Sequence, residues 1–446
     1  MQRLNTKLLI ILLSISSSPR AEDLLTLYRQ ATQSDPTTKL AQLQVELGEA
    51  QLTQARGTLM PQINANVNIS GNNQNVTSTI PNAPAVNNAS LYGGERYTVA
   101  LTQSVIDLPK FYNWQRYQNI VEQYESGNEE AQQTLMYNMI ERYFNVLEVS
   151  DTLSLVEQEI ASTQKQLQQM QRQFKKQMVK ITDVYELEAK LDLLSANQIA
   201  VQTKLDIAQQ NLMELTGKIT QHLAPLRQDI LFPQLTGSID EWVAQAETLN
   251  PGVIAQNKAI DAADQNLWQQ QAKHLPTVDM QLNYFNTNTG QPGFQNQTSL
   301  VETQMAAVNI NVPIFSSGVT SGGVDEASKS LEINKEKRTL LLRTLIKDTR
   351  DSFLSTNASI KRISAAEKAL ESSTKAREAM QKGFNFGMQT ISDVLVSEDR
   401  EFKAKLDILQ AKYEYIKNRA RFEKSTGLIN DKFIENVNQW LLTGKS

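Results

Sequence analysis

The chain contains two copies of one sequence unit, and this duplication restricts its fold more than any other feature. The stretch QFKKQMVKITDV (173–184) matches GFNFGMQTISDV (383–394), and both end in a hydroxyl–Asp–Val step. Self-similarity at a fixed offset indicates repeated structural units. We therefore divide the chain into a first repeat at 22–217, a linker at 218–238, a second repeat at 239–427 and a C-terminal tail at 428–446.

Each repeat contains two segments in which apolar and polar residues alternate. QINANVNIS (62–70) places Ile63, Val67 and Ile69 on one face and asparagines on the other, and TVDMQLNYF (277–285) shows the same alternation. A period of two predicts β-strands, and about ten tilted residues cross a bilayer. The predicted strands are 62–70, 96–106, 277–285 and 303–314, with Asn-, Gly-, Pro- and Ser-rich loops at 71–95 and 286–301.

Alternation alone is equally compatible with a half-buried strand of a soluble sheet, and two further features favour the membrane. The apolar run LLIILLSIS (8–16) follows basic residues and precedes small ones, so residues 1–21 are predicted to be a secretory signal peptide. Aromatic residues cluster at the strand ends, as in the girdles of membrane barrels. They are Tyr92, Tyr97, Phe111, Tyr112, Trp114, Tyr284, Phe285 and Phe315.

The number of predicted strands requires several copies of the chain. A single-chain outer-membrane barrel has at least about eight strands, and this chain offers four. Open sheet edges are not tolerated in lipid. We therefore expect identical chains to close one barrel together.

After its second strand each repeat shows an uninterrupted helical pattern of about 65 residues. Apolar residues step by three and four from Val146 to Phe174, and again from Leu187 to Leu215. A sustained heptad pattern predicts helices paired as coiled coils, and about 65 residues reach roughly 100 Å. The duplicated motif falls between the outgoing and returning helices, so it is predicted to form hairpin tips near 175–183 and 384–393.

The tips contain residues typical of helix starts. Thr182 and Ser392 are expected to be N-caps, with Asp183 and Asp393 in the first turn, where the positive helix end favours a carboxylate. This capping role is the alternative to any functional role for the two aspartates.

Composition excludes several classes of chemistry. The chain has no cysteine, and its two histidines, His222 and His274, lack metal-ligand spacing. The Gly-rich stretch SSGVTSGG (316–323) has no lysine and is therefore not a P-loop. A net charge of −4 gives no general attraction to nucleic acid. We expect no enzyme activity, no cofactor, no metal site and no nucleic-acid partner.

The order and spacing of these parts resemble the TolC-type outer-membrane export channels over roughly residues 22–427. The stretches that match are LTQSVIDL (101–108), RYFNVLE (142–148), ITDVYELEAKLD (181–192), HLPTVDM (274–280), NVPIFSSG (311–318) and TISDVL (390–395). The resemblance implies a mixed α and β fold and a homotrimer. Its membrane β-barrel has four strands per chain, 12 in the trimer, and a long antiparallel coiled-coil α-helical barrel continues it through the periplasm.

The resemblance also implies a constriction at the second tip. In that family two aspartates one helical turn apart ring the pore. Here Asp393 takes the first position and Val396 takes the second, so one acidic ring is missing. Three Asp393 carboxylates in a narrow mouth would attract cations and repel one another, which would couple their pKa values and raise them. Val396 would add an apolar collar that resists wetting.

Two more sets of tip residues follow from the resemblance. The family closes its gate with bonds from a Tyr and an Arg to a Thr–Asp pair; the residues at these places are Phe384, Gln389, Thr182 and Asp183. Because Phe384 lacks the hydroxyl and Gln389 lacks the charge, this route should hold the closed state less firmly. The family receives a periplasmic adaptor at a glycine in each tip, and the docking residues here would be Gln177, Met178, Gly387 and Met388.

The resulting hypothesis is a passive, gated outer-membrane exit duct that extends into the periplasm and works with a periplasmic adaptor and an inner-membrane pump of the RND, ABC or MFS type. No nucleotide-hydrolysing motif is present, so the pump must supply the energy. A second hypothesis assigns the same duct to type I protein secretion. A third, from another class, is a non-conducting periplasmic coiled-coil scaffold.

Overall fold

The computed structural model describes residues 22–442 except 80, 82–85, 219, 221 and 291–297. The predicted signal peptide at 1–21 lies outside the described residues. Two compact units are present, and each repeat contributes to both. We call residues 40–129 and 251–343 the sheet unit, and we call the remaining residues the hairpin unit.

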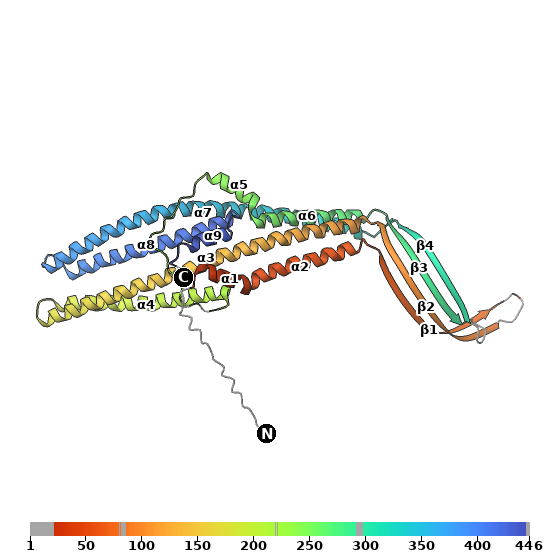
Figure 1. Ribbon diagram of the computed structural model, residues 1–446, viewed down its shortest axis with the longest axis horizontal. Coiled ribbons are helices and arrows are strands. Elements are labelled where there is room, and N and C mark those ends of the chain that lie inside the picture. The colour runs from red at the N-terminus through yellow and green to blue at the C-terminus, as the bar shows by residue number, and fades with distance from the viewer. Residues whose placement is uncertain are drawn as a thin grey trace, which may run out of the picture. The chain divides into compact units, whose positions relative to one another are not determined.

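The sheet unit contains one antiparallel sheet with the strand order β1-β2-β3-β4 (Figure 1). Its strands are β1 (Gln62–Ser78), β2 (Val86–Ile106), β3 (Thr277–Gly290) and β4 (Thr298–Asn311). The prediction of a mixed α and β fold with four strands is confirmed. Within the described residues β1 and β4 have a strand partner on one side only, so the sheet has two open edges.

The strands are longer than predicted on their loop sides. The predicted loop at 71–95 is mostly strand, because β1 and β2 stay paired from Gln62↔Thr102 to Ser78↔Val86. Asparagine and glycine disfavour strands only weakly, and backbone pairing overrides that preference here. At its other end β4 stops at Asn311, three residues short of the predicted 314, because Pro313 has no N–H to donate to a ladder.

The register places apolar side chains of all four strands in common rows. One row contains Ile63, Leu101, Leu282 and Ala306. The neighbouring row on the opposite face contains Asn64, Ala100, Asn283 and Met305. Since directly opposed residues point to the same face, the sheet is apolar on one side and more polar on the other. In one chain the apolar side is uncovered, with Ile63, Val67 and Val308 exposed.

Helices α2 (Pro36–Gly57) and α6 (Pro251–Ala272) precede the two strand pairs, and each begins with a proline, which suits a first helical position. Within the sheet unit, α6 is tied to α7 (Val319–Asn385) where Gln256 donates to the Asn334 carbonyl at 3.0 Å. No described helix is long and apolar enough to cross a membrane.

The hairpin unit contains two long helical hairpins. The first joins α3 (Leu108–Lys175) to α4 (Ile181–Thr216), and the second joins α7 to α8 (Ile391–Ser425). The helices α3 and α7 have 68 and 67 residues, so the predicted long helices are confirmed. Figure 1 shows the tips of both hairpins at its left edge.

A large core holds the hairpin unit together away from the tips. Its largest fully buried side chains come from α3 and α8 and include Tyr143, Phe144, Tyr413 and Tyr415. Helices α1 (Leu24–Ser34) and α9 (Asp431–Asn438) contribute Leu24, Leu27, Ile434 and Val437 to the same core. Helix α5 (Ile239–Leu249) follows the linker and starts at a capping box formed by Ser238 and Glu241.

Candidate functional site at the hairpin tips

The two tips have the same backbone conformation. In the first, Gln177 N–H donates to Phe174 O at 2.8 Å and Met178 N–H donates to Gln173 O at 3.0 Å. In the second, Gly387 N–H donates to Phe384 O at 2.9 Å and Met388 N–H donates to Gly383 O at 2.8 Å. This pair of bonds is the Schellman motif, which needs one left-handed residue. That residue is Gln177 (φ 61°) in the first tip and Gly387 (φ 73°) in the second.

The N-caps lie two residues earlier than predicted. Helix α8 is capped by Thr390, whose Oγ1 accepts from Asp393 N–H at 3.2 Å, while Asp393 Oδ2 accepts from Thr390 N–H at 3.0 Å. Helix α4 is preceded by Lys180, whose side chain makes no capping bond. Thr182 and Ser392 are therefore not caps but second helical residues, because α4 begins at Ile181 and α8 begins at Ile391.

A small apolar cluster, which we call the tip core, joins the two hairpins. It consists of buried residues from α3, α4 and α8, with partly buried neighbours that include Phe384. The six buried members are Met170, Val184, Leu187, Ile391, Val394 and Leu395. The duplicated motif thus places Val184 and Val394 in one cluster, and each hairpin covers the other near its tip.

The predicted gate residues do not bond to one another within one chain. Asp183 accepts from Lys180 N–H at 3.1 Å, which is a local helix-start contact. Phe384 packs on the tip core, and the side chain of Gln389 lies against Gly383. Among the described residues, no hydrogen bond or ion pair joins Thr182 or Asp183 to Phe384 or Gln389.

The predicted constriction residues share an exposed face of α8. Asp393 is exposed, and Val396, one turn later, is 48% exposed, whereas Val394 and Leu395 beside them are buried. The hydrogen bonds from the Thr390 side chain and backbone lower the pKa of Asp393 below its ordinary value. These bonds hold the Asp393 side chain in one orientation and favour its ionised form in the single chain. Repulsion between three Asp393 carboxylates in a trimer would instead raise the pKa.

The predicted docking residues are all exposed at the turns. Met178 is 68% exposed, Met388 is 72% exposed, and Phe386 beside Gly387 is 79% exposed. The first tip also presents four exposed cations that form no salt bridge with any residue the structure describes: Arg172, Lys175, Lys176 and Lys180. The two turns thus expose Met178, Phe386 and Met388, and single exposed apolar residues are ordinary on a protein surface.

Comparison with known proteins identifies the family. The model of the family described as outer membrane efflux protein matches residues 27–218 and 242–428. The chain belongs to this family. It is 27% identical to the outer membrane protein TolC of Escherichia coli K12, over 98% of this chain and 89% of TolC. It is 25% identical to the alkaline protease secretion protein AprF of Pseudomonas aeruginosa, over the whole chain and 93% of AprF.

Solved structures agree at the level of the fold. The Campylobacter jejuni CmeC outer membrane channel superposes with a TM-score of 0.79 at 15% identity, covering 94% of this chain and 90% of CmeC. The protein is therefore an outer-membrane export channel, as predicted, and its family is not a family of enzymes. The non-conducting scaffold is disfavoured accordingly.

One charged cluster of this efflux protein was not predicted from the sequence. Lys190 of α4 is buried between the hairpins, where its Nζ lies 3.0 Å from Glu398 Oε2 and 3.2 Å from Glu159 Oε1. The sequence contained a signal: Lys190 follows the buried Leu187 by three residues and Glu398 follows Val394 by four, so both charges lie on apolar faces. A buried charge of this kind requires a partner.

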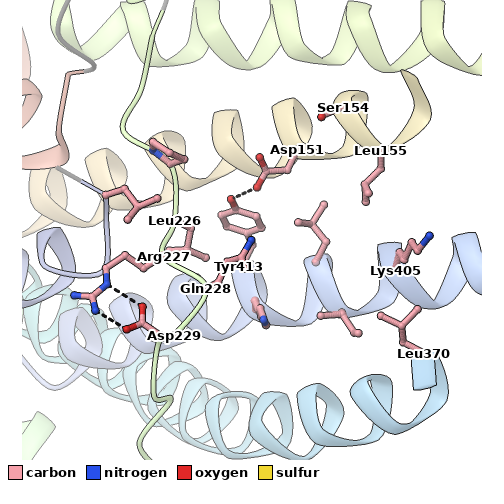
Figure 2. Close-up of a pocket in the computed structure, with 15 residues that line it drawn as sticks. Asp151, Ser154, Leu155, Leu226, Arg227, Gln228, Asp229, Leu370, Lys405 and Tyr413 are labelled. Atoms are coloured by element: carbon pink, nitrogen blue, oxygen red, sulfur yellow. Dashed lines mark hydrogen bonds and ion pairs between the residues drawn. The ribbon is translucent and has the colours of Figure 1, made fainter. Parts of the chain in front are cut away.

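The hairpin unit also contains a cavity. It is a cavity of about 760 Å³ between the linker segment 225–229 and helices α3, α7 and α8. Figure 2 shows Tyr413 pointing toward Asp151, to which its hydroxyl donates at 2.6 Å, and the Arg227–Asp229 pair on the linker. Burial raises the pKa of Asp151, and the bond from Tyr413 opposes that rise only in part. The cavity wall is otherwise mostly aliphatic, with Leu155, Leu370 and Leu409.

Proposed function

We propose that three copies of this chain form one outer-membrane duct that carries substrates passively from an inner-membrane pump to the outside. The observation that carries this proposal is the sheet: four strands with one uncovered apolar face and two open edges. Lipid would cover the apolar face, but an open edge in lipid leaves backbone groups unsatisfied. Pairing β1 of one chain with β4 of the next would remove both edges and give a twelve-stranded barrel.

The gate of this duct would lie at the hairpin tips. In a trimer the exposed face of α8 would meet its symmetry mates, and three Asp393 carboxylates would form the charged ring at the narrowest point. Rings of acidic side chains favour cations. Val396, one turn away, would form an apolar collar beside that ring, which supports a constriction that wets poorly when narrow.

Partner proteins would dock on the exposed turns. Gln177, Met178, Gly387 and Met388 are the residues we assign to a periplasmic adaptor, and their exposure in the single chain supports this. The duct contains no motif that could drive transport. An RND, ABC or MFS pump in the inner membrane would therefore complete a tripartite system.

A second candidate is the outer-membrane component of type I protein secretion. The similarity to the protease secretion protein AprF over the whole chain favours it. The same duct would serve both roles, so the two candidates differ in cargo and not in architecture.

The test is single-channel recording on purified protein in planar bilayers. The wild type should conduct with a preference for cations, and Asp393→Asn should remove most of that preference because the ring loses its charge. Asp183→Asn is the matched control, since Asp183 occupies the same third helical position in the first tip and also accepts from the preceding turn.

We expect Asp183→Asn to leave ion selectivity at the wild-type value. Equal loss of selectivity in both variants, or no loss in Asp393→Asn, would contradict the ring. A wild type that never conducts would contradict the duct itself.

A further inference from the structure

The strongest unassigned feature of the hairpin unit is the buried charge cluster around Lys190. Besides Glu398 and Glu159, Lys190 Nζ lies 3.3 Å from Asp399 Oδ1. The side chain of Lys190 is 10% exposed and that of Glu398 is 8% exposed, whereas Asp399 is 69% exposed. Gln166 of α3 donates to the second carboxylate oxygen of Glu398 at 2.6 Å.

The cluster connects the two hairpins. Glu398 belongs to the second hairpin, and both of its polar partners, Lys190 and Gln166, belong to the first. Burial alone would lower the pKa of Lys190, but Glu398, Glu159 and Asp399 outweigh burial and hold it above its ordinary value. Lys190 is therefore charged in this packing, and separating the hairpins would break its contacts with Glu398.

The tips themselves offer no such link. Phe384 and Gln389 make apolar or local contacts, as described above, and the tip core contributes packing without charge. Among the described residues between the tips and the Tyr413–Asp151 bond, the polar contacts that join the two hairpins are those from Lys190 and Gln166 to α8.

We propose that Lys190 and Glu398 form a latch that holds the two hairpins of each chain together while the duct is closed. The proposal rests on the gated duct proposed above. In this proposal the interaction that stabilises the closed state is buried between the two hairpins of one chain. It lies about two helical turns from the tips and does not involve the turn residues.

The energetics make the latch selective for the closed state. In an open arrangement with the hairpins apart, water would solvate Lys190 and Glu398 separately. Removing Lys190 would leave the buried Glu398 carboxylate with only the Gln166 amide in the closed state, and this is a large penalty. Removing Glu398 should cost less, because Lys190 keeps its contacts with Glu159 and Asp399. Replacing both with apolar residues of similar size removes that penalty, because a buried ion pair is often no better than apolar packing.

The experiment compares the resting conductance of four proteins in planar bilayers: wild type, Lys190→Met, Glu398→Met and the double variant. We expect Lys190→Met to raise the open fraction by about tenfold or more and Glu398→Met to raise it by less, while the double variant returns toward the wild-type value. This reversal separates a latch from general loosening, since two independent lesions would instead add.

Glu401→Gln is the matched control. Glu401 is buried like Glu398 and is joined to Arg377, Lys405 and Thr374, but all of these lie on α7 and α8 within the second hairpin. We expect it to leave the resting conductance unchanged. A control that opens the duct as much as Lys190→Met would overturn the latch.

Two further outcomes are decisive. Wild-type conductance in Lys190→Met channels would overturn the latch while leaving the duct intact, whereas a wild type without any current would overturn the proposed function instead. If Lys190→Met does not assemble, the test uses Glu398→Gln instead. Glutamine has nearly the same shape as glutamate, and its side-chain oxygen can still accept the hydrogen bond from Gln166. An open fraction of Glu398→Gln equal to that of the wild type would then overturn the proposal.

Discussion

The two hairpin tips share one backbone but differ in how their sequences specify it. The second tip has glycine at its left-handed position and Thr390 as a cap, so its own residues favour the observed turn. The first tip has Gln177 at the left-handed position and Lys180 before the helix, and neither residue favours the turn. The second tip is thus determined locally, whereas the first depends on its packing against the tip core.

The tips also differ on their surfaces. The first is basic through Lys175, Lys176 and Lys180, whereas the second presents Phe386 and Met388 and is nearly neutral. A docking partner would therefore meet two chemistries, one suited to acidic groups and one to apolar groups. The second tip, whose own residues favour its turn, also contains Asp393. The proposed charged ring therefore lies next to the turn that the local sequence stabilises more.

The largest expected effect comes from exchanging the left-handed residues. Gly387→Ala should cost about 1–2 kcal/mol of local stability, since a Cβ disfavours the left-handed conformation. The site has room for the methyl group, with no heavy atom within 4 Å of its position, so the backbone alone is responsible. Amide exchange of Met388, whose N–H bonds to Gly383 O, measures the opening free energy of the tip.

The converse change, Gln177→Gly, should stabilise the first tip by less than about 1 kcal/mol, because glycine also gains freedom in the unfolded chain. Amide exchange of Met178 reports it. Unchanged protection in both tips would show that the left-handed residues do not distinguish them.

A smaller effect is expected at the caps. Thr390→Ala should destabilise the start of α8 by about 1 kcal/mol, since the Asp393 N–H loses its acceptor. Lys180→Ala should change α4 by no more than a few tenths of a kcal/mol, because the Lys180 side chain makes no capping bond. Exchange rates of the first amides of each helix test the difference, and equal losses would contradict it.

The smallest expected effect is a pH dependence of the second tip. The folded pKa of Asp393 is lowered by Thr390, so its contribution to stability is present above the ordinary aspartate pKa of about 4. That contribution should be lost as the pH falls through the lower folded value. Titration of the Asp393 carboxyl by NMR should show the lowered pKa in the wild type and a value nearer the ordinary one in Thr390→Ala.

Much of the fold could be predicted from the sequence because its patterns are long. Helices of 67 and 68 residues repeat a heptad many times, and four alternating segments define the strands. The ends of the strands could not be predicted, because the pairing of Asn72 with Tyr92 depends on a partner and not on the propensity of asparagine. The caps were predicted two residues late because Thr182 and Ser392 resemble caps as strongly as Thr390 does.

The site was predictable only where it is local. The turns and their exposed methionines follow from the duplicated motif, whereas the Lys190–Glu398 pair joins residues 208 positions apart. A single sequence shows that each charge interrupts an apolar face, but it does not show which charges meet. Because Gln389 is uncharged where the family has an arginine, the sequence predicted that the closed gate is weakly stabilised. The structure indicates another contact that could stabilise it, the Lys190–Glu398 pair.

We propose that three chains share one barrel, because one chain has too few strands to close it. Native mass spectrometry of detergent-extracted protein tests this most directly. We predict a species with three times the mass of one chain. The full sequence has a mass of 50.1 kDa, and each chain would be somewhat lighter if the predicted signal peptide is removed. A stable monomer under conditions that preserve outer-membrane trimers would contradict the account.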